Sequence, residues 1–165
     1  MPRRLLRNHA LESDEWRYVG EAASAVLDAK IPVIVEFLEW QNERGAWLSR
    51  GGRLGVVLSG ESKLELIAND LPQLSLIACR FSGPSDGRGY TQGRVLRERY
   101  GFAGELRAVG YVRTDQLFFL ARMGFDSFEM ADADLEPGLA SFATFSHAYQ
   151  RSNDKGLPQT LSRGA

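Results

Sequence analysis

Arginine and aspartate side chains gather in two short polar segments of the chain, GPSDGRGYTQ (83–92) and GYVRTDQ (110–116). Each follows an apolar segment and precedes a helical pattern, so we expect both to be strand-to-helix turns. Such turns lie at the carboxyl ends of parallel strands, where α/β proteins commonly bind ligands. Guanidinium groups bind carboxylate, sulfate or phosphate through paired hydrogen bonds, and a glycine-bearing turn at a helix start adds backbone N–H donors. The two turns therefore predict a site for a small oxyanion.

The predicted anion site takes residues from both turns and from the strand end before the first. In it, Arg88 and the neighbouring backbone hold the anion and Asp86 orients Arg88. The full set is Arg80, Asp86, Gly87, Arg88, Gly89, Tyr90, Arg113 and Asp115.

Two other interpretations of these residues stay open. In a purely structural one, Asp86 caps the loop, Arg88 pairs with Asp86 or Asp115, and the glycines serve tight turns. In the other, the arginines form an interaction surface. Nucleotide binding is not indicated, because SGPSDGRGY matches neither the P-loop nor the GxGxxG pattern.

Elements able to position these turns recur along the chain. Apolar, β-branched segments predict strands at 31–37, 53–58, 74–81, 105–112 and 126–131, and helical patterns follow at 38–50, 59–73, 90–101, 113–124 and 135–150. About five consecutive strand–helix units require a mainly parallel sheet, since each helix is a crossover. We expect an α/β fold that is either an open three-layer sandwich or a curved, barrel-like sheet.

The domain organisation follows from the same pattern. We expect one α/β domain over residues 1–150, in which 1–30 form an irregular N-terminal appendage, and a flexible C-terminal tail at 151–165. Residues 1–30 allow either two short strands or a strand and a turn. An open sheet edge or a helix face then favours a homodimer.

Composition excludes several classes of protein. No apolar segment reaches the roughly 18–20 residues of a membrane span and no signal peptide precedes the domain, so we expect a cytoplasmic protein without membrane contact. A net charge of -1 and a pI near 6.1 argue against nucleic-acid binding, although residues 80–122 carry eight arginines against four acidic residues. The single Cys79 is expected to be inert, and two separated histidines indicate no metal site.

The segment DGRGYTQGRVLRERYGFAGELRAVGYVRTDQLFFLARMGF resembles the bacterial family called domain of unknown function 934, and the resemblance extends over about residues 31–150. It implies a role beside assimilatory sulfite reductase, where family members are described as probable oxidoreductases or accessory proteins. In this chain Tyr111 replaces an acidic residue of the family pattern GELRAVGDV. The pattern positions that match are Asp86, Gly87, Arg88, Gly89, Tyr90, Arg94, Arg97, Asp115 and Gln116.

Together these observations predict an accessory protein or oxidoreductase of sulfite reduction with an arginine-lined anion-binding edge. Its expected partner is a small oxyanion or an acidic protein, such as sulfite reductase itself. One alternative is a non-catalytic protein that docks on sulfite reductase or its electron donor. Another is a small barrel-like enzyme acting on a phosphorylated or sulfonated metabolite. The sequence assigns no catalytic residue and no cofactor; a flavin phosphate would fit the same edge, but no motif requires it.

Overall fold

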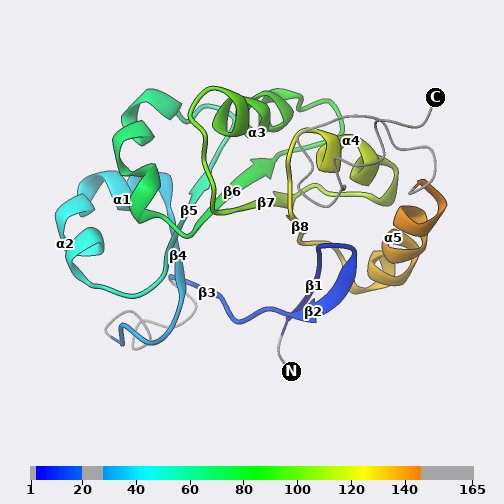
Figure 1. Cartoon of the computed structure of the whole chain (residues 1–165), viewed down its shortest axis with the longest axis horizontal. Helices are drawn as coiled ribbons and strands as arrows, with labels where there is room; N and C mark the ends of the chain where they lie inside the picture. Colours follow the sequence, from blue (N-terminus) through cyan, green and yellow to red (C-terminus); the bar gives the residue numbers. More distant parts are fainter. Residues whose placement is uncertain (1–2, 20–27, 146–165) are drawn as a thin grey trace, which may run out of the picture.

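A computed structural model describes residues 3–19 and 28–145 of the chain. They form an α/β fold around one eight-stranded sheet with the strand order β2-β1-β8-β7-β6-β5-β4-β3 (Figure 1). Strands β3 to β8 run parallel to one another, whereas β1 pairs antiparallel with both β8 and β2. The strands are β1 Arg4–Arg7, β2 Ala10–Ser13, β3 Arg17–Tyr18, β4 Val33–Glu36, β5 Leu54–Leu58, β6 Leu76–Phe81, β7 Glu105–Gly110 and β8 Ser127–Phe128.

The sheet is curled into a half-barrel, which is the barrel-like alternative of the two architectures expected from the sequence. Strands β2 and β3 lie at opposite ends of the strand order, yet only residues 14–16 connect them. A flat sheet of eight strands would separate its edges by about 34 Å, whereas this connection spans at most about 14 Å. The sheet must therefore curl until its two edges approach each other, as Figure 1 shows.

Helical segments connect the parallel strands in the order that the sequence predicts, but their lengths and types differ. The predicted helix at 38–50 is broken at Glu43, and the one at 59–73 consists of two 3-10 helices with Pro72 inside the second. The helical segments are α1 Phe37–Asn42, α2 Arg44–Ser49, the 3-10 helices Leu64–Leu66 and Ala68–Gln73, α3 Arg88–Glu98, the 3-10 helix Thr114–Gln116, α4 Leu117–Arg122 and α5 Asp132–Phe145. No helix in the described ranges is long and apolar enough to cross a membrane.

Alternate residues of each strand face opposite sides of the sheet. On β5, Val56 joins the large core beneath the helices, whereas Val57 belongs to a smaller cluster on the concave, helix-free face. The concave cluster contains Trp16, Ile34, Val57, Leu76, Ala78 and Val109. Because β4 to β7 contribute to both clusters, the middle of the sheet is covered on both sides.

The N-terminal segment differs most from the expectation of an irregular appendage. It supplies a hairpin at one edge of the sheet, a strand at the other, and the connection between them. Leu5, Leu6 and Trp16 are buried, so residues 3–18 complete the fold rather than extend from it. The predicted tail at 151–165 and the end of the last predicted helix lie outside the described residues.

Candidate functional site

Asp86 organises the loop between β6 and α3. Its carboxylate accepts hydrogen bonds from the backbone N–H and hydroxyl of Ser82, at 3.1 and 2.7 Å, and from the backbone N–H and Nε of Arg88, at 3.2 and 3.0 Å. These bonds, led by the one from Arg88, hold the pKa of Asp86 below its usual range. Because Asp86 secures the Arg88 N–H, α3 begins at Arg88, earlier than the sequence pattern indicates.

The Arg88 side chain remains 53% exposed, although its Nε is bound to Asp86. The group lies directly over Gly60, where an added Cβ would stand 2.4 Å from Nε, and Nη1 lies 3.9 Å from Glu61. The loop after β5 and the loop after β6 therefore meet around Arg88. This arrangement matches the structural interpretation of Asp86 and Arg88 and leaves the outer face of the guanidinium in solvent.

Two glycines assigned to the anion site have different surroundings. An added Cβ at Gly89 would lie 2.6 Å from the ring of Phe81, whereas one at Gly87 would meet no atom within 4 Å. Gly89 thus permits α3 to approach β6 closely, and its position has a packing reason independent of any ligand.

Tyr90 links the two turns that the sequence singles out. Its ring packs edge-on against Phe81 at 5.1 Å. Burial raises the pKa of the Tyr90 hydroxyl most, and the nearby charge of Asp115 raises it further. A hydrogen bond with Gln116 lowers it, but by less. The turn after β6 and the turn after β7 accordingly lie side by side. Arg113 is exposed there, and its backbone N–H donates to Gln116 Oε1 at 2.7 Å.

Arg80 stands apart from the other predicted site residues because its side chain faces the concave side of β6. Its guanidinium makes two hydrogen bonds with Glu36 at the end of β4, Nη1 to Oε2 at 3.0 Å and Nη2 to Oε1 at 2.6 Å. The side chains of Arg80 and Glu36 are 41% and 50% exposed. Arg80 and Arg88 thus have different carboxylate partners.

Five polar side chains, three from strand ends and two from residues that flank β1 and β8, meet at this end of the half-barrel, which we call the mouth: Arg3, Tyr18, Glu36, Arg80 and Glu129. The Tyr18 hydroxyl donates to Glu129 Oε2 at 2.7 Å, and Arg3 Nη1 lies 3.3 Å from Glu129 Oε1. Arg3 also stands over the Tyr18 ring at 4.6 Å. Burial, followed by Glu129, raises the pKa of Tyr18 above its ordinary value. The pKa of Arg80 is raised chiefly by Glu36, with contributions from Tyr18 and Glu129, so Arg80 lies within electrostatic range of the Tyr18–Glu129 pair.

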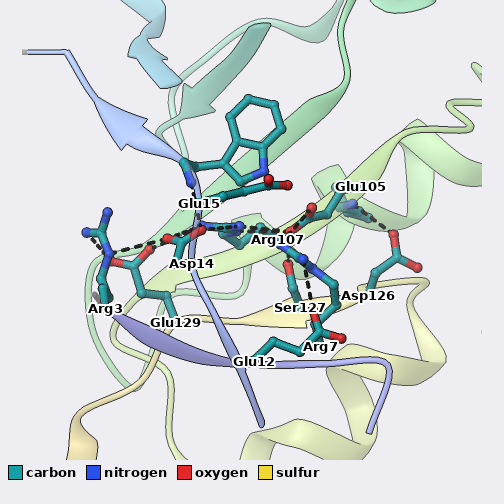
Figure 2. A network of polar contacts seen from close by, with 12 residues as sticks. Arg3, Arg7, Glu12, Asp14, Glu15, Glu105, Arg107, Asp126, Ser127 and Glu129 are labelled. Carbon is teal, nitrogen blue, oxygen red and sulfur yellow. Dashed lines mark hydrogen bonds and ion pairs between the residues drawn. The ribbon is translucent and has the colours of Figure 1, made fainter. Parts of the chain in front are cut away.

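Below the mouth, the fully buried Arg107 binds carboxylates from both sides (Figure 2). Its Nη1 and Nη2 donate to Asp14 at 2.9 and 3.1 Å, and Nη2 also donates to Glu105 at 2.9 Å. Burial alone lowers the pKa of Arg107, but its hydrogen bonds and attraction to Asp14 and Glu105 outweigh burial and raise it. Asp14 belongs to the connection between β2 and β3, so this ion pair ties the connection to the middle of the sheet.

Sequence reasoning missed the mouth except for Arg80. Glu129 and Tyr18 are 111 residues apart in the chain, and no motif joins them. The sequence did contain a signal for Arg107. Charged residues are rarely buried without a partner, so an arginine in the middle of the apolar segment ELRAVG indicates a buried ion pair.

The remaining arginines of α3 have structural partners. Arg97 is almost fully buried and donates to the carbonyl oxygens of Phe102, Gly104 and Gly124. Arg94 makes an exposed ion pair with Glu98 one turn later, at 2.9 Å. Neither arginine belongs to the mouth.

Metal and thiol chemistry receive no geometric support in the parts of the chain that the structure covers. Within 3–19 and 28–145, no group of three or more His, Cys, Asp or Glu side chains is placed to hold a metal ion. Cys79 is buried, and burial raises its pKa to about 12, so its thiol stays protonated at neutral pH.

No curated protein matches the sequence. The sequence model of a family described as "Bacterial protein of unknown function (DUF934)" matches residues 55–160, which contain β6 to β8, α3 to α5, all but the first residue of β5, and all eight residues of the predicted anion site. The match covers more than half of the chain, and the chain therefore belongs to the DUF934 family of bacterial proteins.

Proposed function

We propose that this protein is an accessory protein of assimilatory sulfite reduction that binds a small oxyanion at the mouth of its half-barrel. Arg80 is the residue that binds the anion. When no oxyanion is bound, Glu36 pairs with the Arg80 guanidinium. The oxyanion displaces Glu36 when it binds. The anion site therefore lies on the concave face of the sheet, and not in the loop around Arg88 where the sequence predicts it.

The exposed, two-pronged ion pair between Arg80 and Glu36 carries this proposal. Its two parallel hydrogen bonds have the geometry with which a guanidinium also binds sulfite, sulfate or phosphate. Exposed ion pairs contribute only about 0–1 kcal/mol, so an oxyanion displaces Glu36 at small cost. Arg88 is a weaker candidate, because its Nε is already bound to the nearly buried carboxylate of Asp86.

The position of the pair supports a binding role. In barrels built from βα units, functional side chains come from the carboxyl ends of several strands. Arg80 and Glu36 stand at such ends on β6 and β4, above the apolar side chains of Ala78 and Ile34. The link to sulfite reduction rests on the family resemblance, which implies that members accompany sulfite reductase.

Thermal unfolding in the presence of sulfite, sulfate, phosphate or chloride at equal ionic strength tests the site. We expect one or more of the oxyanions to raise the Tm of the wild-type protein above its value in chloride. Arg80→Ala abolishes this increase. Arg94→Ala, which removes an exposed arginine of α3, leaves it intact and serves as the matched control. Equal increases in wild type and Arg80→Ala would overturn the proposal.

A docking function is the second candidate, and the exposed residues beside the mouth favour it. Arg88 and Arg113 are exposed on neighbouring turns, and the apolar side chains of Leu38 and Tyr111 are exposed at the same end of the sheet. Arginine and aromatic side chains are the types that dominate binding energy at protein interfaces. The partner is an acidic surface, for which sulfite reductase is the first candidate.

Binding to purified sulfite reductase distinguishes this candidate from the oxyanion site. If docking is the function, the double variant Arg88→Glu/Arg113→Glu loses binding and Arg80→Ala retains it. Absence of binding by the wild-type protein at micromolar concentrations would eliminate the docking candidate and leave the oxyanion site untouched.

A further inference from the structure

Helix α4 presents a face that points away from the core. Its buried residues Leu117, Leu120 and Ala121 pack inward. The opposite face is formed by Asp115, which belongs to the 3-10 turn before the helix, and by Phe118, Phe119 and Arg122 of α4. The spacing of three, four and seven residues places these four side chains along one line on the helix surface.

Aromatic side chains form the middle of this line, in which Asp115 and Phe119 are exposed and Phe118 and Arg122 are half-buried. Phe119 is 55% exposed, and its ring lies 5.9 Å from that of Phe118 in an edge-on arrangement. The guanidinium of Arg122 stands over the Phe118 ring at 5.5 Å. Within the described part of the chain, Asp115 and Arg122 have no ion-pair partner of opposite charge. Two adjacent aromatic rings are thus flanked by an acidic and a basic side chain.

The order of these four residues is symmetric about the midpoint between Phe118 and Phe119. Asp115 precedes that midpoint by the same number of residues by which Arg122 follows it. A twofold axis through the midpoint, perpendicular to the helix, sets Phe118 of one helix opposite Phe119 of the other. The same axis sets Asp115 opposite Arg122 at both ends of the contact.

We propose that this face of α4 is the contact between two copies of the protein, with the two helices packed antiparallel. A second copy matches the charges because it presents an arginine to each aspartate and an aspartate to each arginine. A partner of uniform charge would attract one end of the line and repel the other. The inference is independent of the proposed oxyanion site, which lies on other elements.

The size of the contact sets the expected affinity. Stable interfaces bury about 800 Å² per partner, more than one face of a short helix supplies. We therefore expect a reversible dimer that dissociates on dilution through the micromolar range.

Sedimentation velocity over a concentration series, at low salt, tests the contact through charge exchange. Asp115→Arg and Arg122→Asp each place like charges opposite one another, and each is expected to weaken dimerisation at least tenfold. The double variant Asp115→Arg/Arg122→Asp restores the opposite charges and recovers the wild-type dissociation constant. Arg94→Glu and Glu98→Arg, on the exposed face of α3, change the net charge equally and leave dimerisation unchanged.

Phe119→Ser provides a test that does not depend on charge. Because the Phe119 ring is exposed, its replacement leaves the circular dichroism spectrum and Tm close to those of the wild type while the dimer is lost. Wild-type protein that remains monomeric at several hundred micromolar would overturn the proposal. So would folded single charge variants that dimerise normally, or a folded double variant that fails to recover.

Discussion

Arg107 is a buried charge on which the stability of the fold depends. It carries its charge at a fully buried position because Asp14 and Glu105 bind it. Removing one partner of a buried ion pair leaves the other charge uncompensated, at a cost of about 3 kcal/mol. We expect that penalty for Asp14→Ala in urea unfolding. The double variant Asp14→Ala/Arg107→Met should cost less than the sum of the single changes; additive costs would show that the pair is not coupled.

Asp86 gives the fold a residue-level dependence on pH. Because its folded-state pKa is lowered, its stabilising effect is complete above the unfolded-state pKa of about 3.9 and is lost as the pH falls through the folded-state value. Asp86→Asn should therefore reduce the free energy of unfolding at pH 7 and reduce it less at pH 3. Glu61→Gln, which alters an 88% exposed carboxylate near Arg88, should change little at either pH. A pH-independent effect of Asp86→Asn would assign the loss to packing instead of charge.

At the residue scale, sequence reasoning identified contacts within one loop and missed those across the sheet. The pairing of Asp86 with Arg88 was among the alternatives because only two positions separate them, and local turn chemistry suffices to predict it. The bonds from Arg80 to Glu36 and from Tyr18 to Glu129 depend on which strands are neighbours and on the direction in which the sheet curls. Neither property is encoded in a local pattern.

At the scale of elements, the packing of α3 on the sheet depends on two glycines. An added Cβ would lie 2.6 Å from the Phe81 ring at Gly89 and 2.3 Å from the Phe125 ring at Gly93. We expect Gly89→Ala and Gly93→Ala to lower the free energy of unfolding by about 1–3 kcal/mol each, since overpacking a core costs that much. Gly87→Ala meets no atom within 4 Å and should leave stability nearly unchanged. Equal tolerance of all three changes would show that α3 is not held this closely to β6.

The strands with strong apolar patterns were predicted well, and the connecting helices less well. Segments such as VIVE and LIACRF are apolar on both sides because helices cover one face and Trp16 with its neighbours covers the other. The 59–73 segment has a helical stripe of leucine and isoleucine, yet it forms 3-10 helices. Pro72 lies inside the second of these helices and has no backbone N–H to donate, so a regular α-helix cannot continue through it.

At the scale of the whole molecule, the N-terminal segment closes the half-barrel. Deletion of residues 1–18 would uncover Arg107 and remove Leu5, Leu6 and Trp16 from the interior. We expect the truncated protein to lose cooperative thermal unfolding, measured by calorimetry. A truncated protein that unfolds cooperatively near the wild-type Tm would restore the view of this segment as an appendage.

The curl of the sheet was one of two architectures that the sequence allowed, and the reason for the ambiguity is physical. The short connection at residues 14–16 forces curvature only once β2 and β3 are known to lie at opposite edges. Strand order results from long-range pairing, which hydrophobic periodicity does not specify. The candidate site depends on the same closure, because Tyr18 reaches Glu129 only across the curled sheet.

Isothermal titration of the wild-type protein and of Glu36→Gln with the oxyanion that raises Tm most tests the central claim most directly. If Glu36 holds the place of an oxyanion on Arg80, removing its charge should tighten binding by up to about fivefold, equivalent to about 1 kcal/mol. Arg80→Ala should show no binding heat. Unchanged or weaker binding by Glu36→Gln, with the protein folded, would contradict the account.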